Sequence, residues 1–298
     1  MSDIPHTCNK LLVEQGLKKG ALGGPYQSNV TLANGISISV KQCVKRVIEL
    51  ETNAPIPCDS LFITFQNVEK LLMLFDGRFY PIEKLTFSLN GDELTDCSSK
   101  YEQKRLSYYS SKDFCQYSWL RLLPFQDMFT AKLYEEWCSL LDDLDIVYQS
   151  LLYSLSDNKI PVDINFAFLA GLAEPFAELL KEKTFYCKSL TPGERSTTLK
   201  MCVDALIMNF GKDIFVNELL SDYANFLNKV VNSRVRIMHI KKKQDNYFDG
   251  KECIKYSMKF SLLYRKILFE ILEIDQCKYD VAIQNATKEI DVWGECKH

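Results

Sequence analysis

The spacing of apolar and polar positions changes along the chain, from the two-residue alternation of β-strands to the three- and four-residue repeat of α-helices. In the first third, residues 30–33 and 36–40 flank Asn34-Gly35, and the second arm alternates apolar residues with serine. Because Asn-Gly readily adopts the positive φ angles of a type I′ turn, this segment predicts a β-hairpin closed by a two-residue turn.

Other runs in this region are rich in β-branched or aromatic residues and predict strands at residues 47–50, 60–65 and 85–89. Residues 67–75 carry apolar side chains at helical spacing and are followed by Asp76-Gly77, which predicts a short helix and its end. The N-terminal part of the chain is therefore expected to be a small mixed domain dominated by a sheet.

Helical spacing dominates the second half of the chain. Residues 131–155 repeat apolar residues every three or four positions, with acidic residues on the opposite face. Four more helices are predicted, separated by breaks that contain proline or glycine, whereas the last twenty residues show no clear pattern. These helices span residues 165–183, 196–210, 214–231 with a continuation toward residue 239, and 252–274.

Together, these patterns predict an α+β protein in which a β-rich domain precedes an all-α domain. The expected β-rich domain covers residues 1–117, and the helical domain covers residues 159–298. Residues 118–158 form the connecting segment and the long helix between them.

Composition and charge narrow the class of protein. With 298 residues, 47% of them hydrophobic, the chain has enough apolar material for a folded core and is not of the disordered class. A net charge of −3 and a pI of about 5.8 exclude a globally basic nucleic-acid coat. Any contact with nucleic acid must therefore come from a local patch.

The cysteines, the lengths of the apolar stretches and the absence of known motifs narrow the class of protein further. The 11 cysteines are scattered singly, without zinc-ligand spacing, and predict free thiols that lie mostly in the core. No apolar stretch approaches the length of a membrane span, and the first 24 residues lack the apolar segment of a signal peptide, so we expect a cytoplasmic protein. The chain has no glycine-rich phosphate loop and no His-Glu-x-x-His motif, which predicts no cofactor and no metal.

Histidine is scarce in this chain, which limits the candidates for acid–base chemistry. Of the three histidines, His6 and His298 lie at the chain ends, and His239 follows Arg234 by five residues. RNA cleavage without a metal needs a base for the 2′-hydroxyl proton and a cation for the charge that develops on the phosphate, and imidazole and guanidinium meet these needs. On a continuous helix the two side chains start about 140° apart, so the arginine must reach around the helix or the helix must unwind locally.

Positive charge is concentrated around this pair of residues. Five cations lie within ten residues of an otherwise acidic chain: Arg234, Arg236, Lys241, Lys242 and Lys243. The cluster is either a binding site for RNA phosphates, contacted by Arg236 and the three lysines, or a solvated helix end. Tyr247 and Phe248 follow it, and either stack on an unpaired base or cap the core.

The helical half resembles the HEPN superfamily of nucleases and nucleotide-binding domains, whose signature is an arginine, four to six residues, and a histidine. Arg234 and His239 match this signature with four residues between them. Residues 166–174 resemble the opening helix of that domain and end in Glu174, an acidic residue of the kind often found there. The order of a β-rich domain, a connecting segment at residues 118–125 and a helical domain resembles that of ApeA-like defence proteins.

The resemblance implies a metal-independent endoribonuclease that acts on RNA, tRNA included, in antiviral or abortive-infection defence. It implies Arg234, His239 and Glu174 as catalytic residues, and a homodimer in which a two-fold axis brings two sites into one cleft. Two positions depart from the pattern, because Val235 stands where a polar residue is usual and Pro175 is expected to kink or restart the helix. A second interpretation stays open, in which the bundle is a non-catalytic module for dimerisation or for binding RNA or nucleotides.

Overall fold

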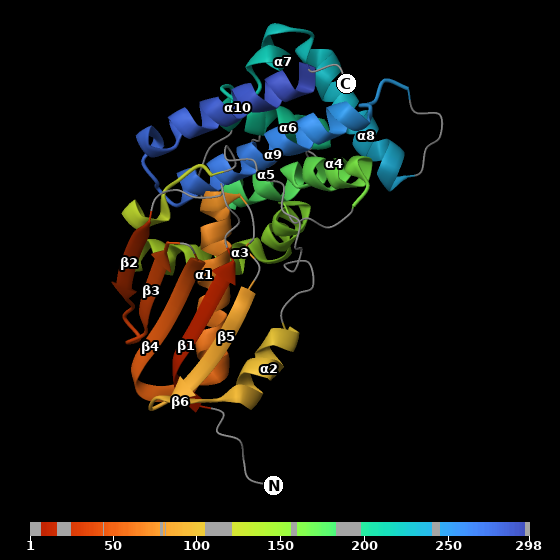
Figure 1. Cartoon of the computed structure of the whole chain (residues 1–298). Helices are drawn as coiled ribbons and strands as arrows, with labels where there is room; N and C mark the ends of the chain where they lie inside the picture. Colours follow the sequence, from red (N-terminus) through yellow and green to blue (C-terminus); the bar gives the residue numbers. More distant parts are fainter. Residues whose placement is uncertain are drawn as a thin grey trace. The chain divides into compact units, whose positions relative to one another are not determined.

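A computed structural model of the chain describes residues 7–16, 25–43, 45–77, 80, 82–104, 121–155, 160–182, 198–239 and 245–295. The chain divides into two compact units, Met1–Ser139 and Leu140–His298. The first unit contains a β-sheet and helices, and the described residues of the second are helical, which confirms the α+β prediction (Figure 1). None of the helices in the described ranges combines the length and the apolar character needed to cross a membrane.

The N-terminal unit is built on an antiparallel sheet of six strands in the order β2-β3-β4-β1-β5-β6. The strands are β1 (Thr7–Gly16), β2 (Tyr26–Thr31), β3 (Ser37–Gln42), β4 (Lys45–Pro57), β5 (Ile82–Leu89) and β6 (Asp92–Glu93). The strands predicted at residues 47–50 and 85–89 are confirmed within β4 and β5. Strand β1, one of the two central strands, was not predicted, because the buried Gln15 on the face of Leu11 and Val13 breaks the apolar alternation.

The predicted hairpin is present as β2 and β3, but the two-residue turn predicted for it is wrong. The Gly35 N–H donates to the Leu32 carbonyl at 3.0 Å, and Gly35 has a φ of 82°, whereas Asn34 does not have a positive φ. These features describe a type I turn followed by a glycine bulge, a three-residue loop. The turn with two positive φ angles joins β5 to β6, at Asn90 (51°) and Gly91 (98°).

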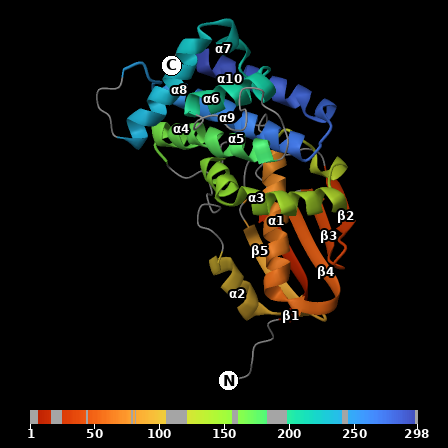
Figure 2. The same ribbon diagram turned by 180° about the vertical axis from the view of Figure 1, so that it is seen from behind.

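Helix α1 (Cys58–Asp76) packs on one face of the sheet (Figure 2). The strand predicted at residues 60–65 is wrong, because this run is the first half of α1. Its apolar side chains continue at helical spacing into the predicted helix 67–75, and Ile63, 56% exposed, lies on the outer side. The helix ends as predicted at Gly77, which has a φ of 68° and donates its N–H to the Met73 carbonyl at 2.7 Å.

A charged cluster is buried where the end of α1 meets β4. Arg46 and Asp76 are each 1% exposed, and Arg46 Nη2 donates to Asp76 Oδ2 at 2.7 Å. Arg46 also donates to Gln42 Oε1, from Nε at 3.2 Å and from Nη2 at 2.8 Å. Arg121 Nε lies 3.5 Å from Asp76 Oδ1. Because buried charges are costly unless they are paired, the cluster favours one position of α1 on the sheet.

Helix α3 (Ala131–Leu155) has the bounds that its apolar repeat predicts. Its first turns belong to the N-terminal unit, where Trp137 Nε1 donates to the Asn67 carbonyl of α1 at 2.9 Å. Helix α2 (Thr95–Lys104) and the short 3-10 turn η3 (Phe125–Asp127) complete the described part of that unit.

The helical unit continues from the second half of α3. Its elements are α4 (Val162–Gly171), α5 (Ala173–Glu182), α6 (Leu199–Leu206), the π turn η4 (Ile207–Gly211), α7 (Val216–Leu220), α8 (Tyr223–Met238), α9 (Gly250–Ile271), η5 (Gln276–Lys278) and α10 (Asp280–Glu295). Helices α4 and α10 pack against α9 (Figure 1). The C-terminal region, for which no element was predicted, is therefore largely the helix α10.

Two predicted helices are each divided in the structure. The helix predicted at 165–183 is interrupted at Leu172, between α4 and α5. Pro175 lies in the first turn of α5, where backbone N–H groups have no acceptor within the helix, so the predicted restart is confirmed. The helix predicted at 214–231 is interrupted before α8, where the Asp222 side chain accepts a backbone N–H at 3.0 Å and caps the new helix.

Helix α9 forms much of the core of this unit and carries an unusual number of buried charges. Thirteen of its residues are buried, among them Lys259, Arg265 and Lys266. The eight described cysteines of the whole chain are free thiols, and five of them are buried, as predicted for thiols in the core.

Candidate functional site

Helix α8 carries the arginine and leads directly to the histidine of the predicted site. Its buried face, which includes Phe226, Leu227 and Val230, packs into the helical unit. The helix ends at Met238, and His239 follows with φ −113° and ψ 6°, donating its N–H to a backbone carbonyl one turn earlier at 3.0 Å. The helical backbone therefore stops at the histidine.

The structure brings two of the three predicted catalytic residues together. Arg234 Nη2 on α8 lies 3.7 Å from Glu174 Oε2 in the first turn of α5. Their side chains are 27% and 42% exposed, so water screens the pair and it contributes little to stability. The carboxylate nevertheless limits the directions in which the Arg234 guanidinium points at the surface.

His239 lies at the surface, at the end of α8. Its side chain is exposed, and no hydrogen bond or ion pair joins its imidazole to another residue in the described part of the chain. On an ideal helix the side chains of Arg234 and His239 leave the axis about 140° apart, and no described contact joins them. The side chain of Arg236, three residues before His239, leaves the helix axis only about 60° from that of the histidine.

Arg236 stacks on an aromatic ring. Its guanidinium carbon lies 3.8 Å from the centroid of the Tyr247 ring, a short cation–π distance. Tyr247 remains 38% exposed. Phe248, by contrast, is 4% exposed and packs on Phe166 with a centroid distance of 5.3 Å. Of the two roles considered for these aromatics, Phe248 therefore caps the core and Tyr247 does not.

The remaining predicted RNA-binding residues, Lys241, Lys242 and Lys243, lie outside the described residues, as do His6 and His298. The described part of the basic cluster is thus Arg234 and Arg236. These two arginines differ in their surroundings, because Arg234 faces a carboxylate and Arg236 faces an aromatic ring.

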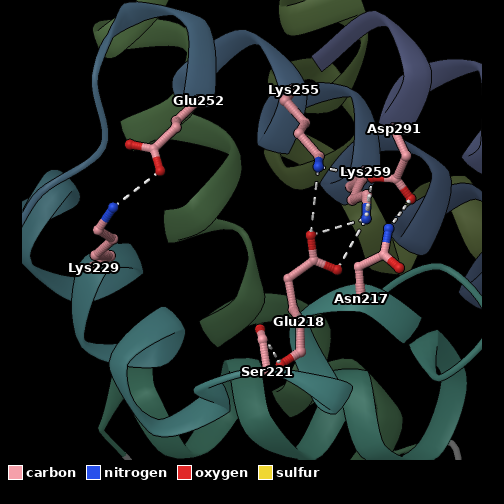
Figure 3. Close-up of polar contacts among 8 residues, drawn as sticks. All are labelled: Asn217, Glu218, Ser221, Lys229, Glu252, Lys255, Lys259 and Asp291. Atoms are coloured by element: carbon pink, nitrogen blue, oxygen red, sulfur yellow. Dashed lines mark hydrogen bonds and ion pairs between the residues drawn. The ribbon is translucent and has the colours of Figure 1, made fainter. Parts of the chain in front are cut away.

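A second polar cluster, which was not predicted, lies inside the helical unit (Figure 3). Lys259 Nζ is fully buried and lies 2.9 Å from both carboxylate oxygens of Glu218 and 2.9 Å from Asp291 Oδ1. Lys255 Nζ lies 2.8 Å from the same Asp291 oxygen and 4.0 Å from Glu218. Asn217 Nδ2 donates to Asp291 Oδ2 at 3.0 Å.

This second cluster joins three helices and balances its charge. Glu218 comes from α7, the two lysines come from α9, and Asp291 comes from α10. Two ammonium groups face two carboxylates, an arrangement that holds helices in register and leaves no unpaired charge to bind a ligand. Burial and the nearby Glu218 raise the pKa of Tyr256 well above its ordinary value, so this phenol stays neutral. A lysine within the apolar stretch of a predicted helix is the sequence signal that could have located the cluster.

Comparison of the chain with protein-family models, curated protein sequences and solved structures finds no match. Among the described residues, no group of three or more histidine, cysteine, aspartate or glutamate side chains is arranged to hold a metal ion. A functional assignment therefore depends on the motif and on the geometry around the end of α8.

Proposed function

We propose that the protein is a metal-independent endoribonuclease of the HEPN type. The observation that carries this proposal is the contact between Arg234 and Glu174, which lie 60 positions apart in the sequence and 3.7 Å apart in the structure. Arg234 was selected with His239 from the sequence motif, and Glu174 from the resemblance of residues 166–174 to the opening helix of HEPN domains. Their proximity at the end of α8 supports a single site made of an imidazole, a guanidinium and a carboxylate.

The proposed reaction is an intramolecular transesterification of RNA. His239 accepts the proton of a 2′-hydroxyl, whose oxygen forms a bond to the adjacent phosphorus while the bond from phosphorus to the 5′-oxygen breaks. The leaving 5′-oxygen takes a proton from an imidazolium, and the products are a 2′,3′-cyclic phosphate and a 5′-hydroxyl. Arg234 stabilises the additional negative charge on the phosphate oxygens, with Glu174 positioning its guanidinium.

A homodimer would complete this chemistry by supplying a second imidazole as the acid. The resemblance to HEPN proteins implies such a two-fold assembly. Two large apolar side chains on the packed pair of helices α4 and α8 are exposed, Met238 at the end of α8 by 50% and Phe168 on α4 by 47%. Exposed apolar side chains of this kind are typical of protein interfaces.

We further propose that the substrate is cellular RNA, tRNA included, and that the biological role is antiviral or abortive-infection defence in the cytoplasm. Lys241, Lys242 and Lys243, together with Arg236, would bind RNA phosphates. The β-rich N-terminal unit would sense the trigger or restrain the nuclease. These roles follow from the resemblance to ApeA-like defence proteins.

A second candidate function is a non-catalytic RNA-binding or dimerisation module. The exposed imidazole of His239, which no described side chain orients, favours this candidate, because a general base is ordinarily held in place. Binding of phosphate by arginine needs no such alignment. Val235, in place of the usual polar residue, is consistent with a site that has lost catalysis.

The deciding experiment is the cleavage of total RNA by purified protein in excess EDTA, with oligomeric state measured in parallel by light scattering. We compare wild type with His239→Ala, Arg234→Ala and Glu174→Gln. Lys288→Ala removes an exposed cation on α10 and is the matched control. Loss of the base is expected to reduce the rate by about 10²–10⁴-fold and loss of the arginine by about 10²–10³-fold.

The Glu174→Gln variant should lose less activity, because the glutamate acts through the arginine. Cyclic phosphate ends on the products would identify the proposed reaction. Cleavage that survives His239→Ala, or that requires a divalent metal, would refute it. RNA binding without cleavage by any variant, with a phage lysate added as trigger, would favour the binding module.

A further inference from the structure

We propose that Tyr247, stacked on Arg236, forms a platform on which an unpaired RNA base stacks beside the scissile phosphate. This inference rests on the proposed function and assigns its substrate class, namely RNA whose target nucleotide is single-stranded. The platform is defined as the ring of Tyr247 and the guanidinium of Arg236.

The two side chains of the platform contact each other and remain partly exposed to solvent. The guanidinium carbon lies 3.8 Å from the ring centroid, and the tyrosine is 38% exposed. No ion pair joins Arg236 to a carboxylate in the described ranges, in contrast to Arg234, which faces Glu174, and to Lys229, which lies 2.9 Å from Glu252 (Figure 3). The charge of Arg236 therefore remains available to a phosphate.

The residues on both sides of Tyr247 are hydrogen-bonded to α8. The Asn232 side chain donates to the carbonyls of Asp245 and Asn246, each at 3.1 Å. On the other side, the Phe248 N–H donates to Ser233 Oγ at 2.8 Å, and the phenylalanine ring is buried.

Asn246, the residue before the tyrosine, makes a further hydrogen bond to α8. Asn246 has a φ of 57°, and its side chain donates to Asn225 Oδ1 at 2.8 Å. These contacts fix the backbone at Tyr247 while its ring stays at the surface, so a stacking partner would meet a preformed surface.

The chemistry of such a surface suits an unstacked nucleobase. Bases that are not paired stack on tyrosine rings and on guanidinium planes, whereas the bases of a duplex stack on one another and are not accessible. Arg236 precedes His239 by three residues, about 4.5 Å along the helix axis and about 60° around it. The proposal places the sugar and phosphate of a nucleotide stacked on the platform on the side of the histidine. The nearby carboxylates Asp249 and Glu252 are engaged in capping α9.

The test uses the full-length protein with His239→Ala, so that RNA is bound and not cut. Short single-stranded RNAs carry the fluorescent base 2-aminopurine at successive positions, and a blunt RNA duplex serves as the comparison. Tyr247→Ala removes the aromatic ring and Tyr247→Phe keeps it. Arg236→Lys keeps the positive charge but removes the planar guanidinium group. Melting temperatures verify that each variant is folded.

We expect quenching of 2-aminopurine at one position, and binding of the single strand about tenfold weaker in Tyr247→Ala, which corresponds to about 1.4 kcal/mol. Tyr247→Phe should bind as well as the parent, Arg236→Lys should lose most of the quenching, and the duplex should be insensitive to all three. If the protein with His239 intact cleaves RNA, but Tyr247→Ala binds RNA as tightly as its parent, the platform is refuted and the proposed nuclease activity is retained. Neither cleavage nor RNA binding by any form would overturn both.

Discussion

Replacing Lys259 with methionine tests how the helical unit is held together. Methionine keeps the apolar stem of the side chain and removes the ammonium group, so the change in packing volume is small. The Lys259 ammonium lies 2.9 Å from both Glu218 oxygens and 2.9 Å from Asp291. The variant therefore isolates the cost of breaking a buried ionic cluster.

The expected cost follows from what remains after the substitution. Asp291 keeps Lys255 at 2.8 Å and the Asn217 amide at 3.0 Å, whereas Glu218, only 4% exposed, keeps Lys255 at 4.0 Å. Removing one partner of a buried ion pair typically costs 3–5 kcal/mol, because the other charge is left without compensation. Since Lys255 still compensates in part, we expect a loss of about 3 kcal/mol in the free energy of unfolding.

Urea unfolding, followed by far-ultraviolet circular dichroism, measures this loss. With a slope of about 2 kcal/mol/M, a loss of about 3 kcal/mol moves the midpoint by about 1.5 M. Hydrogen exchange should accelerate in α7 and α10, the helices that the cluster ties to α9. Lys288→Met, on the exposed side of α10, is the control and should change stability by less than about 0.5 kcal/mol.

A second substitution makes the test specific to Glu218. Adding Glu218→Leu to Lys259→Met removes the uncompensated carboxylate and should recover part of the stability, although Glu218→Leu alone is destabilising. A cost below about 1 kcal/mol for Lys259→Met, or additive costs in the double variant, would refute the reasoning.

The remaining predictions concern the sheet, its hairpin and the thiols. Arg46→Met leaves the buried Asp76 with Arg121, at 3.5 Å, as its ion-pair partner among the described residues. The change should cost about 3 kcal/mol in urea unfolding of the N-terminal unit, and a loss below about 1 kcal/mol would contradict this. Gly35→Ala places a Cβ at a φ of 82° and should cost about 1 kcal/mol, lowering Tm by about 2–4 °C; an unchanged Tm would show that the turn relaxes. Burial raises the pKa of Cys253 to about 12, so at pH 8 its thiolate is rare and the exposed Cys43 should be alkylated first by iodoacetamide, as mass spectrometry would verify. Equal rates at these two cysteines would contradict the burial of Cys253.

Local patterns predicted much of the secondary structure because those elements carry their own periodicity. The apolar repeat of residues 131–155 predicted the bounds of α3, and Pro175 predicted the restart that begins α5. Composition misled where it disagreed with the apolar spacing. Residues 60–65 form helix in spite of their strand-like composition, because their apolar spacing continues into the rest of α1.

The candidate site was predicted only in part. Arg234 and His239 were selected by a motif and Glu174 by the resemblance of residues 166–174 to an opening helix, but the 3.7 Å separation of Arg234 and Glu174 exists only in the folded chain and is not specified by residue spacing. The distinct roles of Tyr247 and Phe248 also depended on packing, because only the folded chain shows which ring is buried.

The sequence by itself determined the α+β class and most of the helices, and it supplied the candidate residues for the proposed RNA cleavage. It did so because hydrophobic periodicity and side-chain chemistry are local properties. The tertiary structure decided the central position of β1, the buried ionic cluster around Lys259 and the stack of Arg236 on Tyr247. Each of these joins residues that lie apart in the chain, and their energies depend on burial and distance, which exist only after the chain has folded.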